Sequence, residues 1–176
     1  MRRSSGLLWV GMVCALVFAG CGGARETVQV RFVQPDGAKV SVYDGDEETW
    51  SPALTIPSHC PFEGGETFRI RLSDIPDQPG EPVWGRLTVE KLTEYTVDCA
   101  VPLEITREDI EDARRNVLVV KVVFLPDEEH ALYQIPGAPT SIVSTMLEPG
   151  KDAVEEAKKQ GTVLLVLRLG GRIHLD

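Results

Sequence analysis

The chain has 176 residues, of which 43% are hydrophobic and 26% charged, and its formal net charge at pH 7 is −9. This length suffices for one domain of ordinary size or two small ones. The acidic balance argues against a surface that binds nucleic acid or anionic lipid, because both require dense Lys and Arg. The motifs GxSxG, HExxH, P-loop and Ser-x-x-Lys do not occur, which weakens an enzymatic interpretation without excluding it. We expect a binding or structural protein without a cofactor.

The N-terminal segment has the three-part layout of a secretory signal. Arg2 and Arg3 precede an apolar run over residues 7–18, and small residues follow before Cys21. The run is too short to cross a hydrocarbon core of about 30 Å, which takes about 20 helical residues. We therefore expect residues 1–20 to be cleaved as a signal peptide. That removal leaves 16 basic and 27 acidic residues, a balance of −11.

Residues 18–21, Phe-Ala-Gly-Cys, resemble the lipobox of bacterial lipoproteins, with Phe18 where leucine is usual. The resemblance implies that Cys21 carries a thioether-linked lipid and that residues 21–26 form a short tether. Each buried acyl CH₂ contributes about 0.8 kcal/mol, so two or more chains hold a protein firmly. The implied location is the exported side of an inner or outer membrane of the cell envelope. An ordinary signal peptide that ends near a cysteine is the alternative.

Two cysteines remain for the folded part, Cys60 and Cys99. Export places them in an oxidising compartment, so we predict a Cys60–Cys99 disulfide. Closing a loop of this length would stabilise the fold by about 4 kcal/mol in the chain-entropy model. Two buried free thiols are the alternative, and a zinc site is disfavoured because no CxxC spacing occurs.

Alternating apolar and polar residues predict five short strands in the N-terminal half. They cover residues 27–33, 38–43, 67–72, 85–92 and 95–101. Pro35-Asp36-Gly37 favours a tight reversal, so we expect the first two strands to pair as an antiparallel hairpin. In the last strand, Cys99 shares the inward face with Val97. Short strands joined by Pro- and Gly-rich turns are typical of an antiparallel β-sandwich.

The pattern changes after residue 104. Thr106 and Asp109 have the spacing of a capping box, which predicts a short helix that Asn116 ends in the left-handed conformation. Residues 117–125 and 162–169 are nearly continuous apolar runs, typical of strands buried on both faces.

A second helix is predicted between these two strands. Asp152 caps it and Gly161 follows its end. Strand, crossover helix, strand predicts a parallel pair, with a possible short strand over 142–146 before the helix and a final strand over 172–175.

These elements predict a mainly β protein with helices, of the α+β class. A β-sandwich-like module covers residues 27–104 and a small α/β module covers 105–176; the two are either separate or packed together as one domain. Parts of the second module resemble the C-terminal block of uncharacterised envelope lipoproteins from planctomycete-type bacteria. The resemblance covers roughly residues 105–170 and lies in residues 105–109, 116–127, 144–150 and 161–170. It implies no activity, since that family has none assigned.

Three sets of residues are candidate sites. Lys121 and Arg168 each interrupt an apolar strand, and a buried cation is costly unless it is paired. They predict an anion site between the two strands, as in a small hydrolase or transferase. The alternatives are charged heads that snorkel to solvent or a structural pair with a helix Glu. Trp50 and Trp84 are either a sugar-stacking platform or partly buried core.

The third set is the acidic turn that contains Asp44, Asp46 and Glu48. Carboxylates at alternate positions suggest a calcium-stabilised binding module, although no EF-hand frame fits and a solvated turn is the alternative. Our leading hypothesis is a lipid-anchored envelope protein of binding or structural type. Its partners are the membrane, through Cys21, and another envelope protein or a surface polymer; nucleic acid is not expected.

Overall fold

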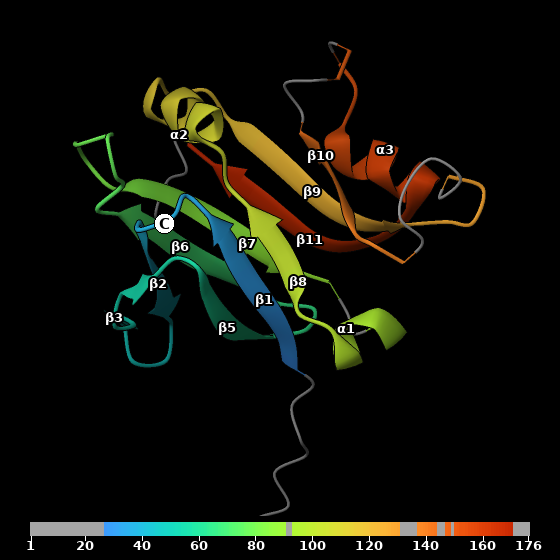
Figure 1. Cartoon of the computed structure of the whole chain (residues 1–176), viewed down its shortest axis with the longest axis horizontal. Helices are drawn as coiled ribbons and strands as arrows, with labels where there is room; N and C mark the ends of the chain where they lie inside the picture. The colour runs from blue at the N-terminus through green and yellow to red at the C-terminus, as the bar shows by residue number, and fades with distance from the viewer. Residues whose placement is uncertain (1–26, 91–92, 131–136, 144–146, 149, 171–176) are drawn as a thin grey trace, which may run out of the picture.

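The computed structural model describes residues 27–90, 93–130, 137–143, 147–148 and 150–170. The protein is mainly β with a few short helices, as predicted (Figure 1). The strands are β1 (Thr27–Gln34), β2 (Lys39–Asp44), β3 (Thr49–Trp50), β4 (Leu54–Thr55), β5 (Ser58–Glu63), β6 (Thr67–Ser73), β7 (Val83–Val89), β8 (Val101–Glu104), β9 (Val119–Pro126), β10 (Thr140–Val143) and β11 (Gly161–Leu169). The helices are α1 (Glu94–Asp98), α2 (Arg107–Arg114) and α3 (Ala153–Gln160). The predicted signal peptide, Cys21, its tether and the predicted strand over 172–175 lie outside the described residues.

The strands form two sheets. The smaller sheet has the order β5-β1-β8, and the larger has the order β10-β9-β11-β7-β6-β2-β3, with β4 also paired to β2. Within the smaller sheet, β1 pairs with β5 in the antiparallel direction and with β8 in the parallel direction. Strand pairing within the larger sheet is antiparallel throughout the described residues.

The predicted alternation of buried and exposed residues along β1 is confirmed. Val28, Val30 and Phe32 are buried, while Gln29 and Arg31 face solvent. The predicted hairpin with the next strand is wrong, because β2 belongs to the larger sheet and pairs with β6. Turn residues 35–37 therefore carry the chain from one sheet to the other rather than back along β1.

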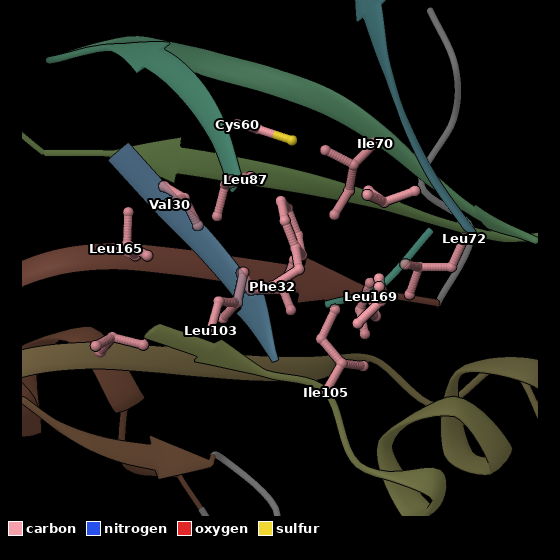
Figure 2. Packing of buried hydrophobic residues seen from close by; sticks show 14 of the residues in the cluster. Val30, Phe32, Cys60, Ile70, Leu72, Leu87, Leu103, Ile105, Leu165 and Leu169 are labelled. Carbon is pink, nitrogen blue, oxygen red and sulfur yellow. The ribbon is translucent and has the colours of Figure 1, made fainter. Parts of the chain in front are cut away.

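One hydrophobic cluster joins the two sheets, as Figure 2 shows for part of it. Val30, Phe32 and Leu103 of the smaller sheet lie against Leu87 and Leu165 of the larger one. Both predicted modules contribute strands to the larger sheet, since β7 and β6 come from the first and β9 and β11 from the second. The boundary near residue 105 therefore does not separate two cores.

The predicted parallel pairing of β9 and β11 is wrong. These strands are antiparallel, with Gly161 opposite Pro126 at one end and Leu169 opposite Val119 at the other. The cause is β10, which pairs antiparallel with β9 and adds one more reversal before α3. The described part of the predicted 142–146 strand is residues 142–143, which belong to β10.

Two helices cover parts of the larger sheet on opposite faces. Capping residues begin both as predicted: Thr106 and Asp109 form the capping box of α2, and Asp152 accepts from the first backbone amides of α3. Asn116 follows α2 with φ +66°, the predicted left-handed conformation. Helix α2 contributes to the cluster between the sheets. Helix α3 packs on the other face of β9 and β11, in a separate cluster with Val122 and Val166.

The predicted strand over 95–101 is wrong at its N-terminal half, where the chain forms α1. Thr93 and Thr96 make reciprocal capping contacts, with each side chain accepting from the other residue's backbone N–H. Val97 is 68% exposed and Cys99 is also exposed, so the predicted inward orientation of both is wrong.

The predicted Cys60–Cys99 disulfide is not formed, and both residues are free thiols. Val30 lies opposite Cys60 on one side and opposite Val101 on the other. Neighbouring strands are about 4.8 Å apart, so two spacings separate the Cα atoms of Cys60 and Val101 by about 10 Å. Cys99 lies two residues before Val101, at the exposed C-terminal cap of α1, whereas Cys60 is buried. A disulfide requires a Cα separation below about 7 Å.

Candidate functional site

Lys121 points from β9 toward the cluster between the sheets. Its ammonium Nζ lies 2.5 Å from Oδ2 of Asp109 on α2 and donates to the backbone oxygen of Glu104 at 2.7 Å. The two side chains are 4% and 8% exposed. A buried ion pair of this kind depends on complete hydrogen bonding to offset desolvation. This geometry is that of a structural pair, and the acidic partner is a helix Asp where we considered a helix Glu.

Arg168 lies on the opposite face of the sheet. In the pairing of β11 with β9, Leu167 is opposite Lys121 and Arg168 is opposite Val120. Directly opposite residues of an antiparallel pair share a face, and neighbours along a strand alternate. The predicted anion site formed jointly by Lys121 and Arg168 is therefore wrong.

Arg168 instead belongs to a line of arginines that crosses three strands. Arg69 of β6 is opposite Arg86 of β7, and Arg86 is opposite Arg168 of β11. We call these three residues the arginine row. All three are half-buried and lie on the face of the larger sheet that points away from the smaller sheet. Neighbouring strands place successive residues of the row about 4.8 Å apart.

An aromatic cluster adjoins the arginine row, formed by Tyr43, Trp50 and Trp84. The ring centroids are 5.3 Å apart for Tyr43–Trp50 and 5.3 Å apart for Trp50–Trp84, the second pair edge to face. The Arg71 guanidinium carbon lies 5.0 Å from the Trp50 centroid and 5.8 Å from that of Trp84. Arg69 lies 4.8 Å from the Tyr43 centroid. We call the arginine row, the aromatic cluster and Arg71 together the arginine–aromatic face.

Three cations of this face lack a carboxylate partner within the described residues. Within the described part of the chain, Arg69, Arg71 and Arg168 make no ion pair. The Nε atom of Arg71 is buried without a hydrogen-bond partner among those residues. Like charges directly opposite each other destabilise a sheet, and cation–π contacts offset this only in part, at about 0.5–2 kcal/mol each. Arg69, Arg71 and Arg168 thus bring positive charge that has no ion pair among the described residues to one face of an acidic protein.

Hydroxyl groups border the same face. Thr67 and Thr88 are opposite each other, next to Arg69 and Arg86 along their strands, and their hydroxyls are 3.0 Å apart. Ser41, opposite Arg71, is buried, and its Oγ has no hydrogen-bond partner in the described residues. Guanidinium, indole, phenol and hydroxyl groups therefore lie together on one sheet face.

A hollow of about 620 Å³ opens at the end of the face beside β2 and β6. Tyr43 and Arg69 line it together with four carboxylate residues, which are Asp44, Asp46, Glu63 and Glu66. The volume lies in the usual range for ligand pockets, about 300–1,000 Å³. The hollow thus adjoins the arginine–aromatic face at its aromatic end.

The acidic turn does not have the form of a calcium site. Asp44 Oδ1 accepts from the backbone N–H of Asp46 at 2.9 Å and of Glu47 at 3.2 Å, which makes it the cap of its own turn. No group of three or more His, Cys, Asp or Glu side chains among the described residues has the arrangement of a metal site. Asp44, Asp46 and Glu48 therefore fit the solvated turn that we considered as the alternative.

Sequence reasoning named Trp50 and Trp84 as a possible pair, and the structure brings them into contact. It did not single out Arg69, Arg71 or Arg86, although their outward positions in alternating strands were the available signal. Only the strand register puts Arg69, Arg86 and Arg168 in one row.

No helix in the described ranges has both the length and the apolar character to cross a membrane. Comparison of the chain with protein-family models, with curated proteins and with solved structures gives no match.

Proposed function

We propose that the protein is a non-enzymatic binding module whose arginine–aromatic face holds an anionic ligand. The observation that carries this proposal is the arginine row, in which neighbouring guanidinium groups face the same way and two of the three lack an ion pair within the described residues. A planar guanidinium matches carboxylate and phosphate oxygens through two parallel hydrogen bonds. An anion on this face would balance the charges of Arg69 and Arg168.

The structural alternative is a cation–π ladder that only stabilises the sheet. It accounts for Arg69 over Tyr43 and for Arg71 beside two indoles. It does not account for Arg168, which has neither a ring contact nor an ion pair within the described residues. An anion that contacts Arg168 would give this side chain the partner that the cation–π ladder does not provide. This favours the binding interpretation.

The N-terminal segment is the basis for a proposal on how this module is attached to the membrane. We propose that the chain is exported and that lipid on Cys21 holds it in the cell envelope, as the resemblance of residues 18–21 to a lipobox implies. From Cys21 to the start of β1 at Thr27 there are six residue steps, which span about 20 Å at most. The folded part then sits close to the bilayer. A β-sandwich-like packing of the two sheets and membership of planctomycete-type envelope lipoproteins belong to the same proposal.

Binding can be tested with sodium polyacrylate, a carboxylate polymer without rings. Tryptophan fluorescence of the full-length protein in a nonionic detergent reports the titration. The double variant Arg69→Gln/Arg168→Gln should lower the affinity by about 100-fold, because each charge-assisted hydrogen-bonded contact contributes about 1.5–3 kcal/mol.

Arg31→Gln on the exposed face of β1 is the matched control, since it removes the same charge from the other sheet. It should leave the affinity within about twofold, because a distant exposed charge is screened. Equal losses for the control and the double variant would show that net charge, and not this face, governs binding.

The anchor can be tested by Cys21→Ser. We expect the wild-type protein in the membrane fraction and the variant released from it or arrested before processing. Unchanged membrane association and unchanged gel mobility of Cys21→Ser would refute the lipid anchor, and this result is independent of the binding test.

A further inference from the structure

We infer that the anionic ligand is an acidic polysaccharide whose pyranose rings carry carboxylates, an inference that rests on the proposed function. Three features of the arginine–aromatic face support it: the length of the arginine row, the position of the face within its sheet, and the mixture of hydroxyl and aromatic groups beside the row.

The length of the row indicates an extended ligand with repeated charges. Arg69, Arg86 and Arg168 lie on three successive strands, so the row extends about 10 Å across the sheet. A single carboxylate or phosphate engages one guanidinium in bidentate fashion. A chain with several carboxylates can engage Arg69 and Arg168, at the two ends of the row, at the same time, which raises affinity through effective concentration.

The position of the face disfavours a peptide ligand. Strands β6, β7 and β11 are interior strands of the larger sheet, so their backbone groups already pair on both sides. An extended peptide cannot add to them as a further strand, which is one common mode of peptide recognition.

The neutral groups of the face suit a ring that carries hydroxyls. The hydroxyls of Thr67 and Thr88 are next to the row and can exchange their mutual hydrogen bond for bonds to a ligand. Trp50 and Trp84 are half-buried and provide apolar surface with a polar edge. Arg71 lies beside both rings, within reach of a carboxylate on a sugar that stacks there.

The test compares three ligands of six units each by isothermal titration calorimetry of the full-length protein in a nonionic detergent. The ligands are an alginate hexasaccharide, an end-capped hexaglutamate peptide and neutral cellohexaose. We expect the alginate hexasaccharide to bind at least about tenfold more tightly than hexaglutamate, because only the sugar uses the hydroxyl and aromatic groups. Cellohexaose should show no measurable heat, since the row needs negative charge.

Three variants locate the binding. Arg168→Gln should weaken alginate binding about tenfold, as expected for loss of one charge-assisted contact, while Arg31→Gln should leave it within about twofold. Trp50→Leu should weaken binding of the alginate hexasaccharide more than binding of hexaglutamate.

The outcomes separate this inference from the function on which it rests. If hexaglutamate binds as tightly as alginate and both depend on Arg168, the inference of a polysaccharide ligand is wrong and the proposed anion-binding function stands. If cellohexaose binds as tightly as alginate, the charge requirement fails and both are overturned. If Arg168→Gln and Arg31→Gln have the same affinity for every ligand, the arginine–aromatic face is not the binding site. The proposed function and the polysaccharide inference are then both wrong.

Discussion

The larger sheet carries cations on both faces, and the two faces treat them differently. Toward the smaller sheet, Lys121 is 4% exposed and satisfied by Asp109 and by the backbone of Glu104. On the other face, Arg69, Arg86 and Arg168 are half-buried in a row, with aromatic rings and hydroxyls as neighbours. Lys121 is paired within the chain, whereas Arg69 and Arg168 make no ion pair among the described residues.

This difference separates a structural cation from one that is available for binding. A buried ammonium without a partner would cost several kcal/mol, so the fold supplies its acceptors from α2 and β8. A half-buried guanidinium keeps contact with water and tolerates the absence of a carboxylate. Both Lys121 and Arg168 interrupt apolar runs in the sequence, yet only the structure distinguishes their roles.

The largest expected effect is at the buried pair. Asp109→Asn removes the charge that balances Lys121 while it keeps an acceptor for the capping contact to Thr106. Breaking a buried pair typically costs about 3–5 kcal/mol, so we expect a loss of that size in the free energy of unfolding, measured by urea denaturation.

Two controls accompany Asp109→Asn. Glu108→Gln, an exposed acidic residue of the same helix, should change stability by less than about 0.5 kcal/mol. The double variant Asp109→Asn/Lys121→Met should recover part of the loss, because it leaves no buried charge. If the double variant is no more stable than Asp109→Asn, the loss has another cause than the unpaired ammonium.

The next effect concerns the two free thiols, one in the core and one on the surface. Cys60 is 5% exposed in the cluster between the sheets, and Cys99 follows α1 in solvent. Cys60→Ser places a hydroxyl in the apolar cluster and should cost about 1–3 kcal/mol. Cys99→Ser should cost less than about 0.5 kcal/mol. Equal costs for the two variants would contradict the assigned positions.

Burial also raises the pKa of the Cys60 thiol above its ordinary value of 9.0. Because the folded pKa is the higher one, the neutral thiol contributes its full stability below about pH 9 and loses it as pH rises through the folded value. We expect the wild-type protein to lose more stability than Cys60→Ala between pH 8 and pH 10 in urea denaturation. Parallel pH profiles for the two proteins would argue against a buried thiol.

The sequence predicted local structure better than strand partners. Alternation identified β1 and β6, a continuous apolar run identified β11, and capping residues identified the starts of α2 and α3. These signals lie within a few neighbouring residues. Alternation assigns a face to a strand but no neighbour. It therefore did not predict that β2 leaves β1 for the other sheet, or that β9 and β11 are antiparallel.

The candidate site was hidden for the same reason. Residues 67–72 showed Arg69 and Arg71 pointing outward, and Trp50 and Trp84 were noted as a pair. The row requires that Arg69, Arg86 and Arg168 come into register, which only strand order can decide. At α1, the alternation of residues 95–101 competed with the reciprocal capping of Thr93 and Thr96, and the capping decided the structure.

A smaller effect is expected in the aromatic cluster. Trp50→Ala removes an edge-to-face contact with Trp84 and a cation–π contact with Arg71. These contribute about 0.5–1.5 kcal/mol and about 0.5–1 kcal/mol at exposed sites, so a loss of about 1–2 kcal/mol is expected, with a weaker near-ultraviolet circular dichroism signal. Leu54→Ala on β4, which is 42% exposed, is the control and should change neither quantity appreciably.

The smallest effect distinguishes the two faces most directly. Arg168→Gln should leave the free energy of unfolding within about 0.5 kcal/mol of wild type, and at low salt it should be slightly stabilising because it relieves repulsion from Arg86. Urea denaturation at two salt concentrations measures this, with Arg31→Gln as the control for loss of one arginine. A loss of more than about 2 kcal/mol would place Arg168 with Lys121 as a structural cation. A stable Arg168→Gln that binds anions about tenfold more weakly would instead show that the chain keeps this charge for a ligand.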